Sequence, residues 1–453
     1  MSRVGKRQTT LARKKIPEDK SRQREAEDAG VMMADVALME EPRSLAIPAL
    51  PDAMRQAGSL LSRNRSLAVL YINCSRINKI ENLCGKKSYL DIMGKIHEVI
   101  TGMKGNQIRQ DDLIVANNTG SDEFTIFLSG KRTDMDYCPS DLESLCERVT
   151  AYLNQSVFPI TFPYLRGNPK ISIGYAVVIH NPLMREERLL NKVIEDAKTM
   201  CNFFEFKRVM RYKEKLQELI LKESIRTIFQ PIVDFSRNEI LGYEALTRGP
   251  ADTEFENPYI LFDAAAETDL LFELDRLCRK KSLQNAKGLK NAHRLFVNCL
   301  PSMVLDPDFR DAYLKSLLEE LRLNTFNIVF EITEREAIEN YDLFNKAVQY
   351  YKDLGFAIAV DDTGSGFSSL ETVVELKPHY IKLDLSLVRG IEKNILKQEL
   401  IKAIQSLAVK MDSLVIAEGI ETEEELNTLR QIGVTVGQGY YFAKPGPAFP
   451  PLR

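Results

Sequence analysis

Short apolar runs and helical periods alternate in the first part of the chain. SLAVLYINC, from Ser66, is rich in strand formers and precedes a helical period over residues 77–100. DDLIVANN and DEFTIFLSG are strand-like runs on either side of a hairpin turn at 119–121. A helix near 142–153, a strand ISIGYAVV and a helix over 188–202 follow. The pattern predicts an α+β unit with a mostly antiparallel sheet.

The pattern changes after a charged stretch, Lys207–Lys222, whose period fits a connecting helix and which we take as the domain boundary. IRTIFQPIVD and ILGYEALTR predict a hairpin, followed by a helical segment over 262–286. The strands that we then expect are LFVNCL, IVFEIT, FAIAVDD, YIKLD, LVIAEG and TVGQGYYF, with helices between them. Continuous apolar strands alternating with helices indicate a parallel sheet covered by helices. Roughly eight strands in about 230 residues predict an α/β fold closed as a TIM-like (β/α)8 barrel.

Four segments follow from these patterns: a disordered or helical tail (1–62), the α+β unit (63–212), a linker helix (213–221) and the barrel (222–453). The first thirty residues are mostly polar or charged, which predicts disorder. A hydrophobic content of 44% is enough for two cores.

Charge and composition narrow the class of protein. A formal net charge of -3 gives no electrostatic footprint for DNA, so no DNA partner is expected. We find no signal peptide and no apolar run of membrane-spanning length, and therefore expect a cytoplasmic protein without a membrane span. The seven cysteines show no CxxC spacing, which favours buried reduced thiols over a zinc ribbon or a disulfide framework.

Polar residues interrupt the apolar runs near the carboxyl ends of the predicted barrel strands, the rim that carries the active site of such barrels. They are Glu244, Asn298, Glu331, Glu334, Asp361, Asp362, Lys382, Glu418, Glu421 and Gln438. Carboxylates gathered in one pocket repel each other unless cations bind among them, and an all-oxygen donor set favours Mg²⁺ or Mn²⁺ over Zn²⁺. Two such ions are the usual device for hydrolysing a phosphodiester. The competing interpretation, that each acid only caps the next helix, suits single positions better than the whole set.

The segment from about Leu216 onward resembles an EAL domain, the family of cyclic diguanylate (cyclic di-GMP) phosphodiesterases. The motifs that carry the resemblance are FQPIVD, YEALTR, VNCLP, FEITERE, VDDTGSGFSSL, IKLD, AEGIETEEE and GQGYYFAKP, in the order of the family. The resemblance implies hydrolysis of cyclic di-GMP to linear pGpG with two Mg²⁺ or Mn²⁺ ions. We also expect a homodimer through the EAL domain.

The resemblance also implies roles for individual residues. The implied metal ligands are Glu244, Asn298, Glu331, Asp361, Asp362 and Glu418. Lys382 would orient the attacking water, with Glu418, Glu334 and Glu421 completing the catalytic set. Gln230, Leu246, Arg248 and Gln438 would lie at the substrate.

The first part is similar to a GGDEF domain, the diguanylate cyclase family, because GSDEF (120–124) stands at the position of the signature. It departs from the family where a cyclase needs metal-binding acids, since Ile72–Ser75 carries none. Ser121 replaces the second glycine of the signature, and Glu81-Asn82 replaces an Asn-Asp pair. We therefore expect a degenerate domain without cyclase activity. Two roles remain open for this domain: either it binds GTP and thereby stimulates the barrel, or it makes contacts with protein. The loss of the metal-binding acids favours protein contacts.

Three other interpretations of the sequence are less favoured. Arg109 and Asp112 form an RxxD pattern like the product-inhibition site of GGDEF domains, but Asp112 lies two residues too far from the signature. A non-catalytic receptor for cyclic di-GMP is the main alternative to an enzyme, and the retained metal ligands and Lys382 argue against it. A barrel that enolises sugar phosphates would need a different set of bases and phosphate loops.

Overall fold

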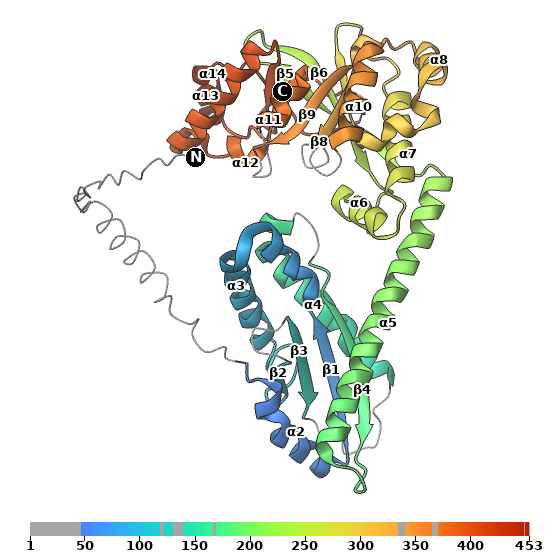
Figure 1. Cartoon of the computed structure of the whole chain (residues 1–453), viewed down its shortest axis with the longest axis vertical. Helices are drawn as coiled ribbons and strands as arrows, with labels where there is room; N and C mark the ends of the chain where they lie inside the picture. Colours follow the sequence, from blue (N-terminus) through green and yellow to red (C-terminus); the bar gives the residue numbers. More distant parts are fainter. Residues whose placement is uncertain are drawn as a thin grey trace, which may run out of the picture.

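The computed structural model describes residues 47–117, 122–129, 139–165, 169–333, 341–364, 370–447 and 449–452. Two units lie one above the other in Figure 1, and the long helix α5 (Glu186–Leu221) connects them. Among the described residues, none of the helices combines the length and the apolar character needed to cross a membrane. The six cysteines in this part of the chain are free thiols, and five are buried as expected, whereas Cys84 is exposed.

The first unit contains a four-stranded antiparallel sheet in the order β2-β3-β1-β4. Helices α3 and α4 pack on one face of the sheet, and α2 and α5 pack on the other. The strands are β1 (Ser66–Asn73), β2 (Leu113–Ala116), β3 (Glu123–Leu128) and β4 (Ser172–Ile179). The helices are α2 (Leu50–Asn64), the 3-10 turn η1 (Ser75–Asn78), α3 (Lys79–Thr101) and α4 (Pro139–Leu165).

The central strand β1 explains why its sequence is a continuous apolar run. Leu70 and Ile72 belong to the core under α3 and α4, whereas Val69 and Tyr71 belong to the core under α2 and α5. Because successive side chains of a strand point to opposite faces, a strand covered on both sides needs apolar residues at every position. The predicted α+β arrangement with antiparallel strands is therefore found in the first unit.

Helix α5 is longer than the sequence pattern indicated. It begins on β4 and continues without a break through the segment predicted as a separate linker helix. A Cβ atom on Gly174 would lie 2.2 Å from the carbonyl oxygen of Ala197, so glycine allows α5 to approach β4 closely. Helix α2, most of which lies in the segment predicted as a tail, packs Ala53, Ala57 and Leu61 into the core with α5.

The second unit is a closed barrel of eight strands in the order β10-β11-β12-β5-β6-β7-β8-β9. Strand β5 is antiparallel to both of its neighbours, β6 and β12, because β5 and β6 form the predicted hairpin. The other neighbouring strands are parallel. The strands are β5 (Arg226–Asp234), β6 (Glu239–Arg248), β7 (Arg294–Asn298), β8 (Ile328–Thr333), β9 (Ala357–Thr363), β10 (Tyr380–Leu383), β11 (Leu414–Ala417) and β12 (Val436–Gly437).

Helices surround the barrel, and the outward-facing strand residues pack against them in the largest core of the molecule. The helical segment predicted over 262–286 is two helices, because the chain turns between them with Asp269 at a φ of 58°. The helices are α6 (Pro258–Glu267), α7 (Leu271–Asn285), α8 (Asp311–Leu321), α10 (Tyr341–Asp353), α11 (Leu370–Leu376), α12 (Leu385–Val388), α13 (Ile395–Lys410) and α14 (Glu423–Ile432).

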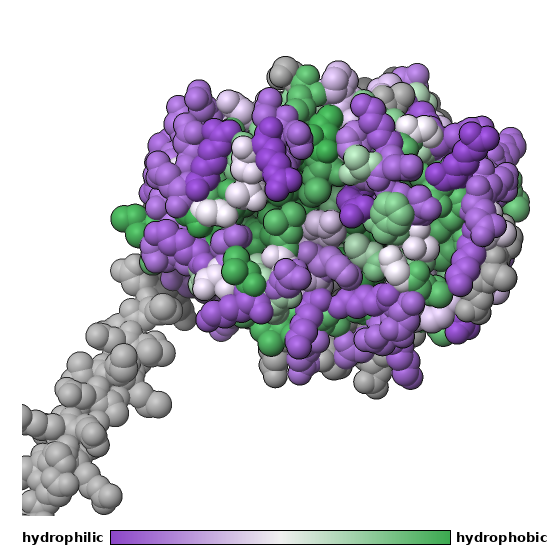
Figure 2. Space-filling view, turned by 90° about the horizontal axis from the view of Figure 1, so that it is seen from above, coloured by the Kyte–Doolittle hydropathy of each residue, from purple (hydrophilic) through white to green (hydrophobic). Residues whose placement is uncertain are grey.

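The two ends of the barrel differ in what surrounds them. Helices α6 and α12, which follow the carboxyl ends of β6 and β10, lie on the side of the barrel that faces the first unit (Figure 1). Figure 2 looks onto the barrel from the other side, where hydrophilic side chains surround a more apolar centre. The carboxyl ends of the parallel strands are thus turned toward the first unit.

Candidate active site at the carboxyl ends of the barrel strands

The interior of the barrel has an apolar layer and a polar layer, and strand periodicity produces both. The apolar layer consists of Ile232, Phe296, Val329, Ala359, Ile416 and Val436. On each of these strands, a polar residue lies two positions from the apolar residue, on the same face and nearer the rim. These residues are, in the same order, Gln230, Asn298, Glu331, Asp361, Glu418 and Gln438. Glu244 and Lys382 come to the same layer from β6 and β10.

Lys382 lies at the centre of this polar layer and is completely buried. Its Nζ atom is 2.7 Å from Glu418, 2.8 Å from Glu331, 3.3 Å from Asp361 and 3.5 Å from Glu244. Five strand-end residues that are far apart in the sequence thus meet within one cluster. The sequence predicted this meeting from their shared position at strand ends.

The electrostatics of the cluster follow from burial and from unequal numbers of opposite charges. Burial alone would lower the pKa of Lys382, but the carboxylates of Asp361, Glu244, Glu331 and Glu418 raise it well above its ordinary value. Burial raises the pKa of Glu331 and of Glu418 well above the ordinary range, against the opposing effect of Lys382. Four carboxylates face one ammonium, so their charges are balanced only if some take up protons or further cations bind.

Glu244 is the acid of the cluster with the most hydrogen-bond donors. Gln438 donates from Nε2 to Glu244 Oε2 at 2.7 Å, and Asn298 donates from Nδ2 to Glu244 Oε1 at 3.1 Å. Burial would raise the pKa of Glu244, but Lys382 and these two amides lower it. Gln438 also donates to Gln230 Oε1 at 2.8 Å, which connects β12, β5 and β6 at the rim.

The donor set of the cluster fits a divalent metal. Oxygens of Glu244, Glu331 and Asp361 lie within 4.8 Å of one another, close enough to share one ion. Neither side-chain oxygen of Glu331 has a hydrogen bond of good geometry among the described residues, although both are buried. Carboxylate oxygens are the ligands that Mg²⁺ and Mn²⁺ prefer. The structure therefore brings together three of the six predicted ligands in a position to bind a metal.

The remaining predicted site residues lie in three different settings. Asp362 follows Asp361 with a φ of 57°, in the left-handed region, and its backbone N–H donates to Asp361 Oδ1 at 2.8 Å. Leu246 and Arg248 lie on the same face of β6 as Glu244, two and four residues nearer the rim. Glu421 contacts Arg389 at 2.7 Å and is exposed, outside the cluster. Glu334 lies outside the described residues.

A buried charged network below the loop after β7 was not predicted. Asp275 Oδ1 accepts from the backbone N–H of Leu300 at 3.2 Å, two residues after Asn298. Arg279, which is completely buried, contacts Asp275 at 2.8 Å and Asp306 at 3.2 Å. The available signal was the spacing of Asp275 and Arg279, one turn apart among the apolar residues of α7. The network fixes the segment that begins at Asn298.

In the first unit, polar residues at the end of β1 bind one another. Asn78 donates to Asp122 Oδ2 at 2.7 Å and accepts from the hydroxyl of Tyr89 at 2.9 Å. Lys198 pairs with Glu123 at 3.2 Å.

Asp112 is buried and accepts hydrogen bonds from the backbone N–H groups of Arg109 and Ser129, so it holds the local backbone. Residues 118–121, which include part of the expected signature, lie outside the described residues.

Sequence comparison assigns the second unit to a family. The profile of the EAL domain matches residues 213–445, more than half of the chain. The chain therefore belongs to the EAL domain family. The TIM-like barrel expected from the sequence agrees with the closed eight-stranded barrel of the structure.

Individual relatives are similar over different parts of the chain. Cyclic di-GMP phosphodiesterase PdeA of Borreliella burgdorferi is 29% identical over 52% of this chain and 38% of its own length. Cyclic di-GMP phosphodiesterase NbdA of Pseudomonas aeruginosa is 24% identical over 85% of this chain and 49% of its own length. The chain thus spans less than half the length of these curated relatives. A standalone versatile EAL protein from Vibrio cholerae O395, solved in its c-di-GMP-bound form, is 34% identical and aligns over 51% of this chain and 95% of its own, with a TM-score of 0.46.

Proposed function

We propose that the barrel hydrolyses cyclic di-GMP to linear pGpG with the help of Mg²⁺ or Mn²⁺. The observation that carries the proposal is the cluster of four carboxylates, three buried and Glu418 partly exposed, around Lys382 at the carboxyl ends of the strands. Membership of the EAL family supports the substrate, since relatives of this chain are named cyclic di-GMP phosphodiesterases. In the reaction, water adds to one phosphorus, the bond from phosphorus to the 3′ oxygen breaks, and that oxygen takes up a proton.

The residues of the cluster divide this task. Divalent ions, when bound, activate water and neutralise charge on the phosphate. We assign their binding to Glu244, Asn298, Glu331, Asp361, Asp362 and Glu418. Lys382 orients the attacking water, because its ammonium donates hydrogen bonds and its pKa keeps it protonated. Arg248 and Leu246 at the rim, with Gln230 and Gln438, contact the substrate.

We infer a supporting role for the first unit, as a degenerate GGDEF-like domain over residues 63–212 that makes no cyclic di-GMP. The support for this assignment is the sequence, because Ile72–Ser75 carries none of the acids that would hold Mg²⁺ against a triphosphate, and Ser121 replaces the second glycine of the signature. We also infer a homodimer through the barrel, which spans residues 222–453.

The test is incubation of the purified chain with cyclic di-GMP and Mg²⁺ or Mn²⁺, with chromatography to detect pGpG. We expect the linear dinucleotide to form and a chelator to stop its formation. Tight binding of cyclic di-GMP without any product would overturn the proposed enzymatic activity and would favour a receptor for cyclic di-GMP. Addition of GTP to the same reaction tests whether the first unit also binds a nucleotide that stimulates the barrel.

A further inference from the structure

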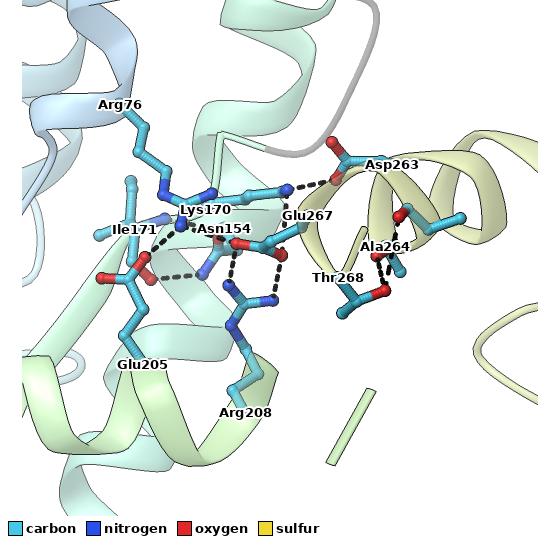
Figure 3. A network of polar contacts seen from close by, with 11 residues as sticks. Arg76, Asn154, Lys170, Ile171, Glu205, Arg208, Asp263, Ala264, Glu267 and Thr268 are labelled. Carbon is cyan, nitrogen blue, oxygen red and sulfur yellow. Dashed lines mark hydrogen bonds and ion pairs between the residues drawn. The ribbon is translucent and has the colours of Figure 1, made fainter. Parts of the chain in front are cut away.

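A cluster of charged residues joins the first unit to helix α6 of the barrel (Figure 3). Glu267, the last residue of α6, contacts Arg76 at 2.6 Å, Arg208 at 3.0 Å and Lys170 at 3.3 Å. Lys170 also contacts Asp263, one turn earlier on α6, at 2.7 Å. We call these five residues the Glu267 cluster.

The Glu267 cluster differs from an ordinary surface ion pair. The Glu267 side chain is only 10% exposed and meets cations from three separate elements: η1, the segment before β4, and α5. Arg208 binds both of its oxygens, a geometry that is stronger than a single contact. A carboxylate at the carboxyl end of a helix is disfavoured by the helix dipole, so its position depends on these cations. The contact is thus specific to the observed arrangement of the two units.

An aromatic contact extends this interface toward the rim of the barrel. Phe162 of α4 meets Tyr259 of α6 edge to face, with ring centroids 6.1 Å apart. Farther along α5, Tyr212 packs against Phe255 with centroids 5.4 Å apart, and Lys215 contacts Glu254 at 2.7 Å. The first unit and α5 together hold both α6 and the loop that joins β6 to α6.

The loop and helix that are held in this way, residues 249–267, begin directly after Arg248, which we place at the substrate. Tyr259, which contacts Phe162 of the first unit, stands in the first turn of α6, the helix that follows this loop. The first unit therefore touches the substrate side of the barrel through α6.

Resting on the proposed function, we propose that the Glu267 cluster is an autoinhibitory contact that holds the first unit against the substrate side of the barrel. A cyclic dinucleotide enters at the carboxyl ends of the strands, and this end is turned toward the first unit (Figure 1). With the cluster intact, α6 and the loop after Arg248 are restrained and access is reduced. Separation of the cluster frees the rim and raises both the affinity for substrate and the rate of hydrolysis.

The test compares full-length variants that lose one carboxylate charge. Glu267→Gln removes the centre of the Glu267 cluster, and Asp263→Asn removes the separate pair with Lys170. Glu223→Gln is the matched control, because Glu223 pairs with Lys280 at 2.6 Å and Lys281 at 2.8 Å without contacting the first unit. We expect Glu267→Gln to raise kcat/KM and tighten Kd for cyclic di-GMP roughly fivefold or more, the lower range of couplings between sites. Asp263→Asn should act in the same direction but more weakly.

A second readout, independent of activity, follows the contact itself. Carbodiimide joins an amine to a carboxylate that it touches, so it should link Lys170 to Asp263 in the wild-type chain, as mass spectrometry detects. The link should decrease in Glu267→Gln and persist in Glu223→Gln. Loss of the link with kcat/KM and Kd equal to the control overturns autoinhibition, as does a decrease in affinity. Absence of pGpG from every variant overturns the proposed function instead, while Kd and the link still decide the role of the Glu267 cluster.

Discussion

We expect Glu244 and Lys382 to respond differently to substitution. Glu244 is one of four carboxylates in the cluster, whereas Lys382 is the cation that these carboxylates surround. Glu244 accepts hydrogen bonds from two amides, which hold its oxygens toward the centre of the barrel. Lys382 compensates four carboxylates at once. Loss of Glu244 should therefore affect chemistry, and loss of Lys382 should affect stability as well.

Glu244→Gln is expected to reduce hydrolysis of cyclic di-GMP by more than the roughly 10- to 100-fold that changes around a metal site cause. The amide keeps the shape of the side chain but loses the charge that attracts a divalent ion. The measurement is pGpG formation over a series of Mn²⁺ concentrations. Glu239→Gln, at the exposed start of the same strand, is the control and should retain activity. Equal activity of the two variants would contradict the assignment of Glu244 as a ligand.

Lys382→Met is expected to lower the free energy of unfolding by about 3–5 kcal/mol in the presence of chelator, because it leaves buried carboxylates without a cation. Added Mg²⁺ or Mn²⁺ should restore more stability to this variant than to the wild type. Urea unfolding with and without metal measures both effects. Lys402→Met, which removes an exposed pair with Glu399, should cost less than about 1 kcal/mol. If added metal restores no stability to Lys382→Met, the result would argue against a divalent metal site in the cluster.

At the scale of elements, α7 supports the segment that follows β7. Arg279→Met should lower the free energy of unfolding by about 3–5 kcal/mol, because Asp275 and Asp306 lose a buried partner. The midpoint of urea unfolding measures this change. Lys280→Met, one residue away on the same helix, removes only a half-exposed pair and should cost about 1 kcal/mol or less. Similar midpoints for the two variants would show that the buried network does not hold the loop.

The elements that could be predicted are those with a local period. The polar layer of the barrel follows from alternation, because Val329 and Glu331, like Ala359 and Asp361, stand two residues apart on strands whose ends must meet. The break between α6 and α7 could not be predicted in this way. It depends on one residue, Asp269, in a left-handed conformation inside a segment of helical period.

The contacts between distant segments could not be predicted from the sequence, for a different reason. Arg76, Lys170 and Glu267 are ordinary charged residues in their local sequences, and only the packing of the two units brings them together. The continuity of α5 was hidden because its charged stretch, Lys207–Lys222, contains few buried residues and therefore resembles a linker. The candidate site was predictable because its residues share a position on each strand, whereas the interface has no such repeated position.

At the scale of the whole molecule, the contact between the units should depend on pH only in acid. Burial would raise the pKa of Glu267, but Arg208, Lys170 and Arg76 lower it to about 2. Since this is below the ordinary value of roughly 4.3, the charged form favours the docked arrangement. Its contribution is complete above about pH 4.3 and is lost as the pH falls toward 2. The charged groups that face Glu267 are Arg76, Lys170, Glu205, Arg208 and Asp263.

Small-angle scattering measures this dependence. The wild-type chain should keep the same dimensions from pH 8 to pH 5 and expand at lower pH as Glu267 takes up a proton. Glu267→Gln should already show the expanded dimensions at pH 7. A wild-type expansion between pH 8 and 5 would mean that another group controls the contact.

The length of α5 has a mechanical consequence. As an unbroken helix of 36 residues it extends roughly 54 Å, with its first turns on the sheet of the first unit and its last turns on the barrel. A rigid rod of that length amplifies angles: a tilt of about 10° at one end moves the other end by roughly 9 Å. At Arg208, 22 residues after the start of α5, the same tilt gives a shift of roughly 6 Å, which is larger than the 3.0 Å that separates Arg208 from Glu267.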